Sequence, residues 1–359
     1  MHSFNPALLN SLAFSQKQVS TLRAIGECRG RQALFYQQAP EILRQLRESA
    51  VIESAESSNR IEGITVSAGR LAPLMQRSTD PRNRSEQELA GYRDALSLIH
   101  DSGTEMPFTP NVLLQLHRTL FRYLPNPGGH WKAANNEIVE TTADSHRRIR
   151  FTPTPAHLVQ MQMEALAQGF REQDNSQAYD PLILIPLAVL DFLCIHPFTD
   201  GNGRIARLLT LMLLYKANYE VGRYISLERV IEDSKESYYE TLERSSQHWH
   251  EGRHDPMPWL NYFWGVLLAA YREFEQQINN APKGRGSKTE QVRLAVLTQV
   301  QPFAISEIEA QCPYVSHDMV RLVLRQMKKE GLISSSGRGR GAKWNLLRQT
   351  IPMTSERPA

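Results

Sequence analysis

The chain has 359 residues, of which 41% are hydrophobic and 22% are charged. This composition is typical of a folded globular protein and excludes a disordered or collagen-like chain. The length suits two or three domains rather than one. The net charge of +3 is too small to indicate a nucleic-acid partner by itself.

The cysteines and the apolar segments bear on the cellular compartment. Three widely spaced cysteines, an odd number, argue against a disulfide framework and for a reducing environment; they are Cys28, Cys194 and Cys312. Residues 1–6 do not form a charged segment that leads into an apolar core, so we expect no secretory signal. The most apolar stretch, residues 181–195, is interrupted by Pro186 and Asp191 and is too short to span a bilayer. We therefore expect a cytoplasmic protein that does not enter a membrane.

Helical periodicity dominates the chain up to about residue 280, because apolar side chains recur every three or four positions. Between residues 43 and 52 this pattern predicts a helix that ends at a polar break, Ser57-Ser58-Asn59. Further helices are expected at residues 89–99, 112–120, 157–170, 181–195, 234–248 and 259–278. The clearest strand signals, residues 136–141 and 148–151, predict one small hairpin. The expected fold class for this part is all-α.

A separate C-terminal unit is expected at residues 289–347. Residues 279–288, which precede it, contain two glycines and no apolar periodicity, so they predict a linker. Residues 348–359, which follow it, predict a flexible tail.

This unit shows three helical segments and then a hairpin. In the second segment Ser306 is expected to open a capping box with Glu309. The third runs from Ser316 to Gly331, and two short strands then flank a Gly-Arg tip at residues 336–341. This order resembles a winged helix-turn-helix.

Basic side chains of the C-terminal unit suit contacts with DNA phosphates. They are Arg321, Arg325, Lys328, Lys329, Arg338, Arg340 and Lys343. The same pattern also suits a protein-docking or dimerisation module. DNA, another protein and a second copy of the chain in a homodimer therefore all stay open as partners.

The most informative segment of the chain is residues 196–207, HPFTDGNGRIAR, which directly precedes an apolar helical run. Gly201 and Gly203 can adopt backbone angles that are closed to other residues. The first N–H groups of the following helix have no intrahelical partners and favour an anion. Arg204 and Arg207 are three apart, so both can lie on one helix face and grip phosphate oxygens.

Two further side chains of this segment suit transfer from a nucleoside triphosphate. Asp200 offers hard oxygen ligands for Mg2+, which usually bridges a carboxylate and substrate phosphates. His196 has a pKa suited to accepting a proton from an attacking hydroxyl. The segment therefore predicts group transfer from ATP or a related nucleotide.

As a full string, H-P-F-x-D-G-N-G-R-x-x-R resembles the signature of the Fic (Fic/Doc) family, and the resemblance covers roughly residues 90–265. Most studied members are helical proteins that transfer AMP from ATP to a hydroxyl of a target protein. A phosphotransferase branch, the Doc toxins, departs at Gly201 and Gly203 and lacks an equivalent of Arg207, so we set it aside.

The resemblance implies a role for each motif residue. His196 is the expected general base, and Asp200 is the expected Mg2+ ligand. The expected nucleotide-binding residues are Gly201, Asn202 and Gly203 as an anion hole, with the Asn202 side chain near the α-phosphate, Arg204 and Arg207 at the β- and γ-phosphates, and Tyr238 and Tyr239 against the adenine. The two tyrosines are equally well explained as plain core residues.

Residues 129–132, GHWK, followed by Ile138 and Val139, resemble the family's flap, a hairpin edge on which an extended target segment can add as a strand. The usual form has arginine where Lys132 stands. An ordinary surface hairpin is the alternative.

Residues 58–63, SNRIEG, resemble the family's inhibitory signature S/T-x-x-x-E-G/N. One helical turn puts Ser58 and Glu62 on the same face, and Gly63 ends the helix. In relatives with this signature the glutamate pairs with the second motif arginine, here Arg207, and takes the place of the γ-phosphate. The resemblance therefore implies an inhibitory helix that precedes the core.

These features together predict an N-terminal helical region at residues 1–88 and a Fic core at residues 89–278. The expected function is that of an autoinhibited protein adenylyltransferase that modifies a Tyr, Thr or Ser hydroxyl of a target protein and of itself, and releases pyrophosphate. Two alternatives stay open. In one, Glu62 positions a water that removes AMP from a modified protein. In the other, the chain is a DNA-binding regulator whose core only senses nucleotide.

Overall fold

The structure is a computed structural model that describes residues 2–38, 40–141, 147–279, 288–299, 302–312, 315–336 and 343–347. Most of the predicted linker, the tip of the predicted wing with Arg338 and Arg340, and the predicted tail lie outside the described residues.

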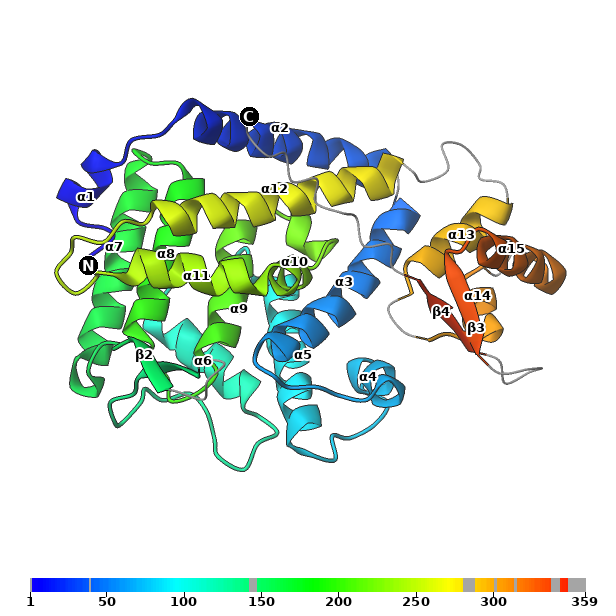
Figure 1. The fold of residues 1–359 in the computed structure, drawn as a ribbon, viewed down its shortest axis with the longest axis horizontal. Helices are drawn as coiled ribbons and strands as arrows, with labels where there is room; N and C mark the ends of the chain where they lie inside the picture. Colours follow the sequence, from blue (N-terminus) through cyan, green and yellow to red (C-terminus); the bar gives the residue numbers. More distant parts are fainter. Residues whose placement is uncertain are drawn as a thin grey trace.

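The main body is mostly helical, as the sequence predicted (Figure 1). Its first helices are α1 (Pro6–Ser11), α2 (Gln16–Gln38), α3 (Pro40–Ile61), α4 (Ala68–Met75), α5 (Arg84–Ser102) and α6 (Pro110–Leu120). An antiparallel hairpin follows, formed by β1 (Ile138–Thr141) and β2 (Arg147–Phe151). The remaining elements are η1 (Ala156–Leu158), α7 (Val159–Ser176), α8 (Pro181–Ile195), α9 (Asn202–Lys216), η2 (Val221–Arg223), α10 (Leu227–Asp233), α11 (Lys235–Ser246) and α12 (Met257–Asn279).

Helix α8 lies at the centre of the main body, where it packs against α7, α9, α11 and α12. It begins where the sequence expected, because Asp180 accepts a hydrogen bond from the Leu182 N–H at 2.8 Å and Pro181 occupies the first turn. At its other end His196 takes a left-handed conformation with φ of 50° and ends the helix. The most apolar segment of the chain therefore delivers His196 to the edge of the core.

Two hydrophobic clusters organise the described residues. The first runs from Phe4 to Ile278 and crosses the boundary predicted near residue 88, so the N-terminal helices share their core with the helices that follow. The second runs from Val292 to Ile333. Cys28, Cys194 and Cys312 are all buried, and Cys28 and Cys194 are free thiols. Among the described helices, none combines the length and the hydrophobicity needed to cross a membrane.

Helix α3 is longer than expected, and the predicted break at Ser57-Ser58-Asn59 is wrong. The three side chains are buried, and Asn59 Nδ2 donates to the Ala55 carbonyl at 2.7 Å. Such residues weaken a helix when their side chains bond the backbone in competing conformations. Here tertiary contacts and an intrahelical bond occupy them, so the helix continues to Ile61.

The C-terminal unit contains α13 (Lys288–Leu297), α14 (Ile305–Gln311), α15 (His317–Lys329), β3 (Ile333–Ser336) and β4 (Lys343–Leu346). It projects to one side of the main body in Figure 1. The strands β3 and β4 pair antiparallel, and Phe303 forms a further bridge to Trp344. Three helices and a hairpin thus surround the second hydrophobic cluster.

The predicted capping box of Ser306 and Glu309 is wrong. Helix α14 already begins at Ile305, with Ala304 as an N-cap that makes no side-chain hydrogen bond. Ile305 packs against the second cluster, so the residue before Ser306 is drawn into the helix.

The contact between α5 and α6 depends on Gly91. A Cβ at this position would lie 1.9 Å from the Leu120 carbonyl oxygen, which is backbone and cannot move away cheaply. We expect Gly91→Ala to lower the free energy of unfolding by about 1–3 kcal/mol. Gly30→Ala on α2 is the matched control, since its Cβ meets nothing within 4 Å and should be neutral or stabilising. Denaturant unfolding of both variants tests this; equal stability would contradict it.

Candidate active site

A cavity of about 650 Å³ opens where the ends of α3 and α8, the start of α9, helix α11 and the β1–β2 hairpin meet. This volume suits a nucleotide-sized ligand. The predicted site residues that line it are Glu62, Ile138, Val139, His196, Gly203, Arg207, Tyr238 and Tyr239. Six other predicted residues do not line the cavity but contact residues that do or that lie beside it. They are Ser58, Gly63, Asp200, Gly201, Asn202 and Arg204.

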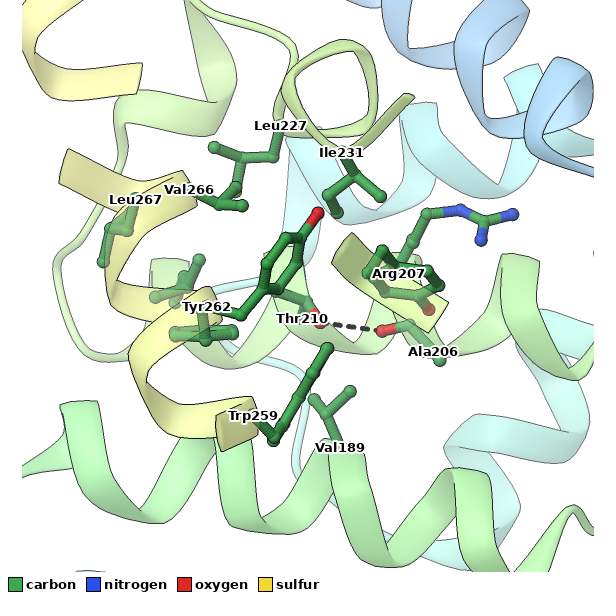
Figure 2. A pocket seen from close by; sticks show the side chains of 13 residues that line it. Val189, Ala206, Arg207, Thr210, Leu227, Ile231, Trp259, Tyr262, Val266 and Leu267 are labelled. Atoms are coloured by element: carbon green, nitrogen blue, oxygen red, sulfur yellow. Dashed lines mark hydrogen bonds between the residues drawn. The ribbon is translucent and has the colours of Figure 1, made fainter. Parts of the chain in front are cut away.

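A second, much smaller cavity lies behind Arg207. Figure 2 shows it between α9, α10 and α12, with Thr210, Ile231 and Trp259 among its walls. Its volume of about 30 Å³ has room for no more than a water molecule. The larger cavity is the candidate active site because the predicted site residues line it.

His196 presents one ring nitrogen to the site. Its Nδ1 lies 3.3 Å from the Leu193 carbonyl oxygen, which can only accept, so Nδ1 carries the proton and Nε2 is left free to act as a base. Burial lowers the pKa of His196 to about 4; the Lys132 charge lowers it too, while the Leu193 bond, Glu62 and Asp200 raise it. The ring is therefore neutral near pH 7, as a proton acceptor must be.

The loop after His196 is held by its own residues. Gly201 is the N-cap of α9 with φ of 81°, and a Cβ there would come within 2.9 Å of the Phe121 ring. The Asn202 side chain is fully engaged with Phe198, because it accepts from the Phe198 N–H at 2.9 Å and donates to the Phe198 carbonyl at 2.7 Å. Asn202 thus braces the loop with its side chain, and its expected position near an α-phosphate stays a prediction.

The start of α9 has no side-chain cap. The first N–H groups of an α-helix also have no intrahelical partners. Here these N–H groups lie at Gly203, which lines the cavity. Such a helix end attracts anions through the exposed N–H groups and the helix dipole.

His117 on α6 holds the loop through a hydrogen bond and a ring contact, a role that the sequence did not predict. Its Nδ1 accepts from the Gly129 N–H at 2.8 Å, so its Nε2 is the protonated atom that donates to the Asp200 carbonyl at 3.2 Å. Its ring also stacks on Phe198 at a centroid distance of 3.8 Å. The only sequence signal was a histidine at a core position of a helix, which gives no hint of this contact.

Arg204 and Arg207 leave α9 into different surroundings. Arg204 is buried beside Glu88 of α5, to which it donates at 2.6 Å, and its Nη2 lies 3.5 Å from Asp200 Oδ1. Arg84 bonds the other oxygen of Glu88 and lies 3.6 Å from Asp200. Arg204 therefore belongs to an ion-pair cluster beside the cavity.

Arg207 is 3% exposed and meets the end of α3. Its Nε donates to Ser58 Oγ at 2.8 Å, and its Nη2 donates to the Ser58 carbonyl at 2.9 Å and to Glu62 Oε1 at 2.7 Å. Burial lowers the pKa of Arg207, but Glu62 and the neighbouring tyrosines raise it by more, so the net pKa is raised and the guanidinium stays charged.

The end of α3 places Glu62 through a specific backbone motif. Gly63 adopts φ of 79°, its N–H bonds the Arg60 carbonyl, and the Ile64 N–H bonds the Asn59 carbonyl. These two bonds form a Schellman motif, which places Glu62 at the C-cap, directly after the last helical residue Ile61. Its carboxylate lies against Gly203, where an added Cβ would be 2.3 Å from Glu62 Oε1 and 3.3 Å from Arg207 Nη1.

Comparison with known proteins agrees with this arrangement. Residues 107–214, which contain His196, Gly203 and Arg207, match the model of the Fic/DOC family. The motif loop therefore lies in a segment that is similar to the Fic/DOC family.

Solved structures of Fic proteins share the fold. A Fic family protein from Desulfovibrio desulfuricans G20 superposes with a TM-score of 0.59 at 20% identity, over 94% of this chain and 98% of that one. A Fic domain containing signaling protein from Bacteroides thetaiotaomicron VPI-5482 also gives 0.59 at 20% identity, over 74% of this chain and all of the other.

Curated relatives include two named protein adenylyltransferase Fic. The one from Drosophila mojavensis is 28% identical over 232 residues, and the one from Drosophila willistoni is 27% identical over 232 residues. Each match covers 60% of this chain but only 43% and 44% of the respective relative, so this chain spans less than half the length of either.

The remaining walls of the site come from α11 and the hairpin. Tyr238 is buried against Trp259 and Tyr262, and Tyr239 is half-buried beside it. Ile138 and Val139 lie at a register shift of the hairpin, opposite Phe151 and Ile149. Tyr238 therefore serves the hydrophobic core as well as the cavity.

Three charged residues of the cavity wall, Arg150, Lys235 and Glu243, were not predicted from the sequence. Arg150 of β2 donates to the Tyr239 carbonyl and to Glu243 Oε2, both at 2.9 Å, and so joins the hairpin to α11. Lys235 of α11 donates to the Ile61 carbonyl at 2.7 Å, at the end of the helix that carries Glu62. No motif links these residues in the sequence, so only the fold brings them to the site.

Asp200 is the carboxylate that suits a metal ion here. Its side chain is about half exposed beside the cavity. Its ion partners are Arg84, whose Nη2 lies 3.6 Å from Oδ2, and Arg204, whose Nη2 lies 3.5 Å from Oδ1. Within the described residues no three His, Cys, Asp or Glu side chains gather as a metal-binding group. A lone carboxylate fits Mg2+ that takes its other oxygens from substrate phosphates and water, which is the usual arrangement for this ion.

The protonation of His196 can be measured directly. We expect its imidazole to titrate near pH 4, because burial disfavours the charged ring. Since this lies below the ordinary value of 6.5, the stability that the neutral ring contributes is complete above pH 6.5 and is lost as the pH falls toward 4. NMR of histidine-labelled protein, assigned with His196→Gln, gives the midpoint; a value at or above 6.5 would refute the burial argument.

Proposed function

We propose that this protein transfers AMP from ATP to a Tyr, Thr or Ser hydroxyl of a target protein and of itself, and releases pyrophosphate. The names of the curated relatives support adenylyl transfer. The observation that carries the proposal is the cavity in which a neutral His196, the uncapped start of α9 and the buried Arg207 converge. A base, an anion site and a fixed positive charge are the groups that phosphoryl-type transfer requires.

The base acts on the target hydroxyl. The hydroxyl oxygen attacks the α-phosphorus of ATP, and the bond from that phosphorus to the oxygen that bridges to the β-phosphate breaks. The hydroxyl proton moves to Nε2 of His196, which the Leu193 contact leaves unprotonated. The bonding electron pair leaves with pyrophosphate. Because no covalent enzyme intermediate is needed, most of the acceleration comes from positioning and charge neutralisation.

The phosphates are expected to lie at the start of α9. The N–H groups beside Gly203 suit the α-phosphate, and Arg207 suits the terminal phosphates as a planar fork of donors. Mg2+ held by Asp200 would neutralise part of the phosphate charge. An extended target segment is expected to pair with the β1 edge at Ile138 and Val139.

We also propose that the described conformation is autoinhibited. Glu62 Oε1 lies 2.7 Å from Arg207 Nη2, so a carboxylate already occupies the donors that a γ-phosphate would use. ATP that binds beside Glu62 would keep its terminal phosphate out of place, and its α-phosphorus would not be in line with the hydroxyl. Movement or loss of Glu62 would therefore activate transfer.

Replacement of Glu62 tests the function and its inhibition together. We expect Glu62→Gly to raise self-modification, followed with α-labelled ATP, by about tenfold or more, since the γ-phosphate regains Arg207. γ-labelled ATP should leave no label on the protein. Adding Arg207→Ala should abolish the gain, and adding His196→Ala should lower transfer by about two to four decades, the range of a general base.

The other outcomes separate the alternatives. If Glu62→Gly is no more active than the wild type, the autoinhibition proposal is wrong. If the wild type removes AMP from modified protein and Glu62→Gly loses this activity while gaining transfer, Glu62 positions water for hydrolysis. If every variant binds ATP and none transfers label, a nucleotide sensor is the better description.

We further propose that α15 docks on DNA. The residues on its inner face are buried in the second hydrophobic cluster; they are Val320, Val323, Leu324 and Met327. The residues on its outer face are exposed and mostly basic; they are Arg321, Leu322, Arg325, Lys328 and Lys329. Helix α15 is the second helix of the helix-turn-helix, so its basic face suits the major groove of DNA. Leu322, which is 56% exposed on this face, could contact a thymine methyl group there. Asp318 is the acidic side chain at its start, and Glu330 is paired with Arg293.

DNA binding by the full chain should weaken steeply with salt, because phosphate contacts release counterions. Arg321→Ala with Arg325→Ala should lower the slope of log K against log salt by about one for each arginine. Arg23→Ala on α2 is the control that should change nothing. Fluorescence anisotropy with a mixed-sequence duplex gives the slopes, and no binding at low salt would favour protein docking instead.

A further inference from the structure

Lys132 is a buried lysine beside the proposed base. It precedes β1, and only 4% of the residue is exposed. A lysine so deeply placed normally has a carboxylate partner. Among the described residues none forms an ion pair with it; its Nζ instead donates to Asn136 Oδ1 at 2.6 Å and to the Ile195 carbonyl at 3.4 Å.

The contacts of Lys132 reach both sides of His196. Its Nζ contacts the carbonyl of Ile195, the residue before the base, and its own N–H donates to the carbonyl of Pro197, the residue after it, at 2.9 Å. Asn136 extends the support, since its Nδ2 donates to the Phe198 carbonyl at 3.4 Å. Three backbone carbonyls between Ile195 and Phe198 are thus held from one short segment.

The backbone between these contacts needs such support. His196 has φ of 50° and ψ of 61°, a left-handed conformation that residues other than glycine adopt at a cost of about 1–3 kcal/mol. The conformation persists only if its surroundings hold it. It also turns the chain from α8 into the motif loop, so it sets the direction of the imidazole.

We infer that Lys132 is a positioning residue for His196: it holds the carbonyls of the residues on both sides of the base and places a positive charge near the imidazole. The inference rests on the proposed role of His196 as the base. Lys132 itself touches no reacting atom.

The charge gives this role a measurable signature. Burial lowers the pKa of Lys132 to about 8, and its charge in turn lowers the pKa of His196. The other charges that face His196 are Glu62 on α3 and Asp200 on the motif loop, and both raise its pKa. Removing the lysine charge should therefore raise the pKa of His196, and loss of the Lys132 proton should be felt by the ring.

The test titrates His196 by NMR in the full chain. We expect Lys132→Met to raise the His196 pKa by about one unit, as for loss of a nearby charge, and Lys132→Arg to leave it low. The wild type should show a second inflection of the His196 signal near pH 8, which Lys132→Arg should lack. Lys216→Met at the far end of α9 is the matched control and should resemble the wild type in every respect.

Kinetics in the Glu62→Gly background add a second readout. Lys132→Met should lower kcat by about tenfold or more and leave the KM for ATP within about threefold, because the base is misplaced while the phosphate site is intact. Lys132→Arg should recover most of kcat.

The inference is overturned if folded Lys132→Met leaves the His196 pKa unchanged, or if the wild type shows no inflection near pH 8. The second measurement needs no variant that might fail to fold. Neither depends on transfer, so a His196 that responds to Lys132 in a protein without adenylyl transfer would support the positioning role and refute the proposed function.

Discussion

A buried positive charge on α9 is the constraint on which the site depends. The Arg207 guanidinium lies almost wholly out of water, where an unpaired charge is strongly unfavourable. The end of α3 bonds its Nε and Nη2 through Ser58 Oγ, the Ser58 carbonyl and Glu62, while Nη1 has no hydrogen-bond partner among the described residues. A phosphate would offer the same kind of oxygens, so under the proposed function the contact that stabilises Arg207 in this structure is the one that a nucleotide would replace.

The motif loop is built for rigidity from several directions. His117 holds the Asp200 carbonyl, Asn202 holds Phe198, and Lys132 holds the neighbours of His196. A catalytic base loses much of its value when it moves by an ångström, so these contacts matter although none of them touches the cavity's contents. The proposed inhibition by contrast depends on the end of one helix, α3, which bonds Arg207 rather than the loop.

Much of this site was predictable because its parts are local in sequence. The twelve residues from His196 to Arg207 carry the base, the glycine turn and the helix start, and the four-residue step from Ser58 to Glu62 predicts a shared helix face. The bounds of α8 followed from the apolar run between Pro181 and Ile195. His117 and Lys132 gave no such signal, since a histidine or lysine shows its partners only when distant segments meet.

The sequence by itself determined the mostly helical fold, the loop and the identity of the chemical groups, because these follow from short-range periodicity and spacing. Tertiary structure decided which partners those groups have. Arg204 and Arg207, three apart on one helix, are separated by Glu88 of α5 and Glu62 of α3 into an ion-pair cluster and a cavity wall. Ser57-Ser58-Asn59 reads locally as a helix break, yet burial keeps it helical. A buried polar group must form hydrogen bonds, and in this site its partners lie far along the chain, so no local sequence pattern predicts them.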